Sequence, residues 1–136
     1  MTDPSEATWF PSVVGAVALL MALLSIGDLV FTPAAQSEQV VCGYMFTGTT
    51  AQVVTLLHVM LFLWIAWGSF LRQRLVAFVT AGYLLYLVAS LWIWTLLFGA
   101  PRYPNAAAVL LLNLVSTLVL LTLCRVVVRR RAAFTR

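Results

Sequence analysis

The sequence predicts an all-α integral membrane protein, in which four transmembrane helices form one antiparallel bundle over residues 1–136. Hydrophobic residues make up 63% of the chain and charged residues 9%, whereas soluble domains have roughly 45 to 50% apolar and about 25% charged residues. A helix needs about 20 mainly apolar residues to cross the hydrocarbon core of a bilayer. Four runs come close to this length, at residues 13–31, 51–71, 75–98 and 106–128.

The first run follows an acidic segment and carries small residues at spacings of three, four and three. They are Gly15, Ala18, Ala22 and Ser25. Small residues on one face let a second helix approach closely, so we expect this face to be a helix-packing surface. A cleaved signal peptide is the competing interpretation, but Asp3 and Glu6 stand where such a peptide carries positive charge, and the apolar run is longer than usual.

The second run contains His58, the only histidine of the chain. On a helical wheel, six residues lie within about 80° of it, whereas the bulky apolar residues point elsewhere. The six are Ala51, Thr55, Phe62, Ile65, Ala66 and Ser69. Because the bilayer core holds no water, we expect the small and polar face to turn toward protein and the bulky face toward lipid.

Two connections differ sharply in length. Residues 32–50 form a polar loop without arginine that includes Cys42, and it is the only loop long enough to have structure of its own. The connection around Arg72 and Arg74 is so short that the second and third spans are expected to pack antiparallel.

The arginines predict the orientation. All eight basic residues are arginine, which weakly favours a bacterial source with a GC-rich genome, and seven of them fall on one side of the predicted membrane, against Arg102 alone on the other. The positive-inside rule then places both termini in the cytoplasm of a protein of the cell inner membrane. Four of the seven form a basic cytoplasmic cluster, namely Arg125, Arg129, Arg130 and Arg131. We interpret them as topology signals and a contact for anionic lipid, not for nucleic acid.

Polar residues recur at similar depths in the four spans. Counted from the outer end of its span, Asp28 is three residues deep, His58 seven, Asn113 seven and Ser90 eight. In the third span, Tyr83, Tyr86 and Trp94 share a face with Ser90. The sequence therefore predicts a polar layer of Asp28, His58, Ser90 and Asn113 in the outer half of the bundle, as a candidate intramembrane site.

Each ionisable member of this layer has a structural and a functional interpretation. Asp28 either reaches water one turn from the interface, or pairs with His58 or Arg102 in a proton relay or ligand site. His58 is either a hydrogen-bonded core residue or a group for proton transfer, quinone contact or haem ligation. One histidine cannot supply both axial ligands of a haem within a monomer.

No catalytic motif, metal-ligand pattern or Cys pair is recognisable in the sequence, so we expect no enzyme activity, no metal and no cofactor. The leading hypothesis is a non-catalytic accessory or scaffold subunit that packs against a larger membrane complex or against copies of itself. One alternative is a homo-oligomeric transporter or channel that uses Asp28, His58 and Asn113. The other is a redox-associated subunit that contacts haem or quinone through His58.

Overall fold

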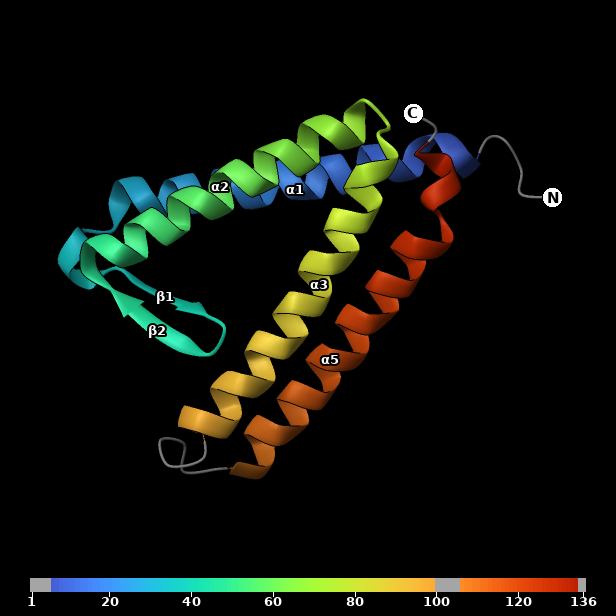
Figure 1. Ribbon diagram of the computed structural model, residues 1–136. Coiled ribbons are helices and arrows are strands. Elements are labelled where there is room, and N and C mark those ends of the chain that lie inside the picture. Colours follow the sequence, from blue (N-terminus) through green and yellow to red (C-terminus); the bar gives the residue numbers. More distant parts are fainter. Residues whose placement is uncertain (1–5, 100–105, 135–136) are drawn as a thin grey trace.

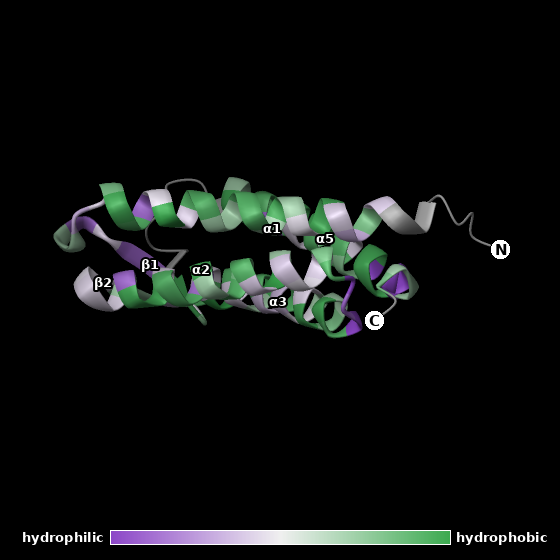
Figure 2. Ribbon diagram, turned by 90° about the horizontal axis from the view of Figure 1, so that it is seen from above, coloured by the Kyte–Doolittle hydropathy of each residue, from purple (hydrophilic) through white to green (hydrophobic). Residues whose placement is uncertain are grey.

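Four long helices form most of the protein, whose structure is a computed structural model that describes residues 6–99 and 106–134. They are α1 (Glu6–Phe31), α2 (Gly48–Phe70), α3 (Arg74–Trp94) and α5 (Ala106–Arg129). Each contains a stretch long and apolar enough to cross a membrane. Apolar residues follow the helices, and hydrophilic ones gather toward the two ends (Figure 2). The prediction of four membrane-spanning helices is therefore confirmed at the level of length and composition.

The helices associate as two antiparallel pairs that diverge from a shared vertex (Figure 1). One pair is α1 with α2, and the other is α3 with α5. The helices α2 and α3 meet mainly near the tight turn at residues 71–73, where Arg72 adopts a positive φ of 55°. The expected bundle around one common core, with α2 and α3 packed along their lengths, is thus not confirmed, because the chain turns sharply there and the pairs separate.

The main apolar core lies at this vertex, where α1 begins, α2 meets α3 and α5 ends. Its buried residues are Phe10, Ala18, Ile65, Ala66, Val76, Ala77, Ala81, Val127 and Phe134. After α5 a single 3-10 turn (Arg131–Ala133) brings Phe134 edge-on against Phe10, with the ring centroids 6.2 Å apart. Phe134 is fully buried, so the end of the described chain closes the vertex.

A β-hairpin occupies the polar connection between α1 and α2 and adds a small sheet to the expected all-α fold. After a 3-10 turn (Ala34–Gln36), strand β1 (Glu38–Val41) pairs antiparallel with β2 (Tyr44–Thr47). The two turn residues, Cys42 and Gly43, have φ of 51° and 80°, as a two-residue type I′ turn requires. Figure 1 shows the hairpin lying between the diverging helix pairs at their open end.

The tip of this hairpin reaches α3. A Cβ atom added at Gly43 would lie 2.2 Å from Cγ2 of Ile93 and 3.0 Å from the backbone nitrogen of Trp94. Only glycine fits such a contact, and glycine also tolerates the positive φ. The hairpin therefore bridges the open end of the two helix pairs.

The spans differ at their ends from the expected bounds. Helix α1 begins at Glu6 instead of residue 13, and α3 ends at Trp94, after which Thr95–Gly99 form a π-helical turn. Of the residues considered in the sequence, Asp3, Arg102 and Arg136 lie outside the described ranges.

Candidate functional site

A cavity of about 220 Å³ lies between the helix pairs, beside strand β1, and we refer to it as the His58 cavity. Its polar and aromatic lining comes from all the elements around it: Ser25, Gln39, Thr55, His58, Tyr83, Tyr86 and Ser90 among others. Phe62 and the apolar side chains of Met21, Val40 and Leu87 complete the wall. Helices α1, α2 and α3 and strand β1 therefore all contribute side chains to one site.

His58 is held by its own helix. Its Nδ1 atom lies 3.0 Å from the carbonyl oxygen of Val54, one turn earlier in α2. A carbonyl oxygen only accepts hydrogen bonds, so Nδ1 carries the proton in this contact. The ring stacks on Phe62 of the same helix, with the centroids 6.2 Å apart and the planes inclined by 30°. These two contacts fix the ring at the wall of the cavity.

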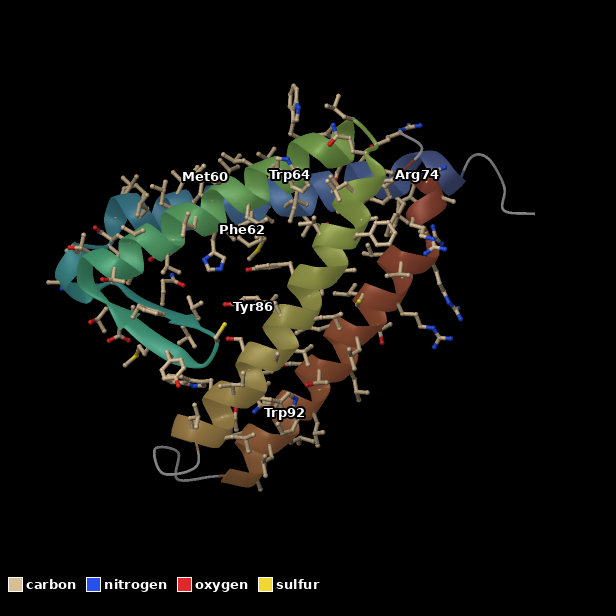
Figure 3. All side chains as sticks on the ribbon, in the orientation of Figure 1. Met60, Phe62, Trp64, Arg74, Tyr86 and Trp92 are labelled. Atoms are coloured by element: carbon tan, nitrogen blue, oxygen red, sulfur yellow. The ribbon has the colours of Figure 1, made fainter. Side chains whose placement is uncertain are left out.

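Aromatic rings connect α2 with α3 across the cavity. Tyr83 meets His58 edge-on at 6.1 Å and Phe62 edge-on at 5.3 Å between ring centroids. Tyr86, one turn along α3, lies 5.8 Å from Tyr83. Phe62 and Tyr86 extend into the space between the helix pairs, whereas Met60 lies on the opposite side of α2 (Figure 3). Of the four residues expected to share a face of α3, Tyr83, Tyr86 and Ser90 therefore line this cavity, whereas Trp94 is not among its lining residues.

Of the four residues of the expected polar layer, the structure brings together His58 and Ser90. Asp28 is exposed near the end of α1 and accepts a hydrogen bond of 2.8 Å from the Thr32 hydroxyl. It does not line the His58 cavity. This arrangement agrees with the structural interpretation of Asp28, a carboxylate close to the helix end.

Asn113 lies inside the other helix pair. It is 3% exposed, and its side-chain amide donates a hydrogen bond to the Thr95 hydroxyl, which in turn donates to the Leu91 carbonyl oxygen. Nearby, the indole nitrogen of Trp92 donates to the Thr117 hydroxyl at 2.9 Å. These polar groups join α3 to α5 (Figure 3 labels Trp92) and are separate from the His58 cavity.

The small-residue face of α1 is used within the chain. A Cβ atom added at Gly15 would lie 3.0 Å from the Phe70 ring and 3.3 Å from the Ala66 carbonyl oxygen, both in α2. Ala18 and Ala22 are buried, and Ser25 lines the His58 cavity. In the single chain this face packs α1 against α2, so it is not free to receive another protein.

The four arginines of the basic cluster have different surroundings in the structure. The Arg130 guanidinium lies over the rings of Trp9 and Phe10, at 5.3 and 5.5 Å from their centroids. Arg131 lines a second cavity, of about 370 Å³, together with Arg74 and Phe78. Arg125 and Arg129 are exposed. Arginines from the beginning of α3 and from the end of α5 thus gather at the vertex.

Several lining residues did not emerge from the sequence. Gln39 and Val40 reach the cavity because they lie on β1, and Gly43, in the two-residue turn Cys42–Gly43, was the available signal for that hairpin. Met21 also lines the cavity, and nothing in the sequence singled it out. Among the described residues, no group of three or more His, Cys, Asp and Glu side chains could hold a metal ion.

The fold and the cavity together define a small multi-pass membrane protein with a polar and aromatic site between two helix pairs. No protein family, curated protein or solved structure matches the chain.

Proposed function

We propose that this protein is a non-catalytic accessory or scaffold subunit that binds a larger membrane complex, or a second copy of itself, within the bilayer. The observation that carries the proposal is the divergence of the helix pairs, which leaves polar and aromatic side chains on the inner side of α2 and α3. Apolar surfaces alone gain little from association in lipid, whereas polar groups and close packing drive it. The inner side of the two pairs is therefore the preferred binding surface.

The packing of α5 supports the same proposal. In its most apolar stretch only 6% of the residues are buried, compared with 39% in α2. Leu111, Leu112 and Leu118 are each exposed by more than 60%. Helix α5 thus has a broad surface for lipid or for a neighbouring protein.

We also propose that the vertex faces the cytoplasm of a bacterial cell and that the β-hairpin faces outward. Arg72 and Arg74 lie in and after the α2–α3 turn, and the basic cluster lies at the end of α5. Figure 1 places both of these segments at the vertex. The positive-inside rule then gives this orientation, with α1 beginning and α5 ending on the cytoplasmic side.

The transport alternative has less support. A continuous polar route would need Asp28, His58 and Asn113 near one another, and these residues occupy three separate places in the fold. The redox-associated alternative is favoured by one observation, the aromatic wall around His58. That wall fits a ring-shaped ligand, with or without redox chemistry.

Native mass spectrometry tests the proposed association, with the protein extracted from its own membrane in a mild detergent and, separately, in polymer nanodiscs. We expect an assembly larger than the monomer, and we expect Leu87→Trp, at the cavity wall, to weaken it. Leu85→Trp is the matched control, because Leu85 is on the same helix and 49% exposed. A monomer in both preparations would contradict the proposal.

A further inference from the structure

The hydrogen bond of His58 determines which of its ring nitrogens can receive a ligand. Nδ1 carries its proton in the contact with the Val54 carbonyl oxygen. In the tautomer that has its proton on Nδ1, the other ring nitrogen, Nε2, has a lone pair that accepts a hydrogen bond. Among the residues that the structure describes, none donates a hydrogen bond to Nε2. The cavity therefore offers a hydrogen-bond acceptor, Nε2 of His58, to a ligand that carries a hydrogen-bond donor.

The aromatic side chains of the cavity wall favour a ligand whose hydrogen-bond donor is attached to a flat ring. Phe62, Tyr83 and Tyr86 supply aromatic surfaces at contact distances from one another. Aromatic rings pair in stacked or edge-on arrangements that add to the energy of burial. A ring that packs against these side chains in the cavity gains such contacts, and a straight acyl chain does not.

The size and place of the cavity limit the ligand further. Its volume of about 220 Å³ is below the ~300 to 1,000 Å³ of usual small-molecule sites, but it is sufficient for a single aromatic ring, since a cavity of about 150 Å³ binds benzene. Gln39 and Val40 of the β-hairpin contribute to its wall, and the other lining residues belong to the helices long and apolar enough to cross a membrane. Because most of this wall comes from such helices, we expect the ligand to be membrane-soluble.

We propose that the His58 cavity binds the ring of a membrane-soluble phenol or hydroquinone, whose hydroxyl group donates a hydrogen bond to Nε2 of His58. The proposal involves binding alone and no chemical step. It extends the idea that the inner side of the helix pairs is a binding surface, but it does not depend on the identity of a partner protein.

The single histidine makes a site-specific test available. Protein labelled with ¹⁵N at histidine is placed in lipid nanodiscs and titrated with 4-octylphenol or with its methyl ether, 4-octylanisole, at equal mole fraction in the lipid. The two probes share ring and tail, and only the phenol donates a hydrogen bond. We expect the resonance of the unprotonated Nε2 to shift with the phenol and to remain largely unchanged with the ether.

Titration of the same nanodisc preparation also gives the dissociation constants of the two probes. One neutral hydrogen bond contributes about 1 kcal/mol, so we expect the phenol to bind roughly five- to tenfold more tightly than the ether. His58→Phe keeps an aromatic ring and removes the acceptor, so it should abolish this preference. If that variant does not fold, Ser25→Phe serves instead, because a large side chain at the cavity wall should block both probes.

Three results would overturn the proposal. They are equal binding of the two probes to the wild-type protein, a phenol preference that survives in His58→Phe or Ser25→Phe, and a ¹⁵N spectrum in which Nε2 carries the proton. None of them bears on the mass of the native assembly, so failure of the ligand proposal is distinguishable from failure of the proposed subunit function.

Discussion

The guanidinium carbon of Arg130 lies 5.3 Å from the centroid of the Trp9 ring, so the end of α5 is bound to the beginning of α1. The same group lies 5.5 Å from the Phe10 ring. A cation over an aromatic ring stabilises a protein by about 0.5 to 1 kcal/mol at exposed sites and by more where water is excluded. This contact and the burial of Phe134 hold the first and last helices together at the vertex.

Replacing Arg130 with Gln should therefore lower the free energy of unfolding by about 1 kcal/mol. The measurement is reversible unfolding in mixed micelles, followed by circular dichroism. Arg129→Gln is the matched control, since Arg129 is exposed and one residue away. Equal effects of the two substitutions would show that charge alone, and not the contact with Trp9, is responsible.

The contact between α1 and α2 gives a second prediction, at Gly15. A methyl group there would approach the Phe70 ring and the Ala66 backbone to within about 3.0 to 3.3 Å. Overpacking of this kind costs about 1 to 3 kcal/mol, so we expect Gly15→Ala to destabilise the protein by about 1 kcal/mol. Gly27→Ala on the same helix meets nothing within 4 Å and should be neutral or stabilising. A loss of stability at Gly27 would argue against this packing.

The four spans could be predicted from the sequence because a membrane span is set by length and apolarity, which are local properties. The helical faces were also predictable, and the face of Tyr83, Tyr86 and Ser90 does line the cavity. The way in which the spans pair could not be predicted, because two residues at equal depth in the bilayer can lie on helices that do not contact each other. Asn113 matches His58 in depth, yet it faces Thr95 inside the α3–α5 pair.

The hairpin tip supplies a third prediction. Gly43 combines a φ of 80° with a contact that leaves no space for a Cβ atom beside Ile93. A left-handed conformation costs an L-residue about 1 to 2 kcal/mol, and the clash adds to this, so Gly43→Ala should release the tip from α3. We expect faster amide hydrogen exchange in β1 and β2, with no change in the core of α2.

A double substitution separates the two effects at Gly43. Adding Ile93→Ala to Gly43→Ala removes the shortest contact, with Cγ2 of Ile93, and leaves the remaining close contacts and the backbone strain, so it should restore only part of the protection in the hairpin. Gly82→Ala is the control, because nothing lies within 4 Å of its added Cβ atom. Unchanged exchange in Gly43→Ala would mean that the tip does not rest on α3.

A fourth prediction concerns the hydrogen bond between Asn113 and Thr95, which joins α5 to the end of α3. Such contacts in membrane proteins contribute on average about 0.6 kcal/mol and at most about 1.7 kcal/mol. Asn113→Ala should lower the free energy of unfolding within this range. Because the two groups share one bond, the loss should shrink in a Thr95→Ala background. Strictly additive losses would contradict a direct interaction.

The two cysteines allow a test of the proposed orientation. Cys42 is exposed at the tip of the β-hairpin, whereas Cys124 is half-buried near the end of α5, with its sulfur 3.7 Å from the Ala81 carbonyl oxygen. In right-side-out membrane vesicles, a membrane-impermeant maleimide should label Cys42 in a Cys124→Ala background. An Ala132→Cys variant that lacks both native cysteines should be labelled only after permeabilisation, since Ala132 is exposed at the vertex.

The reverse pattern of labelling would place the arginine-rich vertex outside the cell and contradict the positive-inside assignment. Labelling of both positions before permeabilisation would identify leaky vesicles, which a cytoplasmic marker enzyme reveals independently. Because α1 begins and α5 ends at the same vertex, one correctly oriented cysteine also fixes the side of both helix ends. The experiment thus decides from which side of the membrane a partner reaches the hairpin and from which side it reaches the basic cluster.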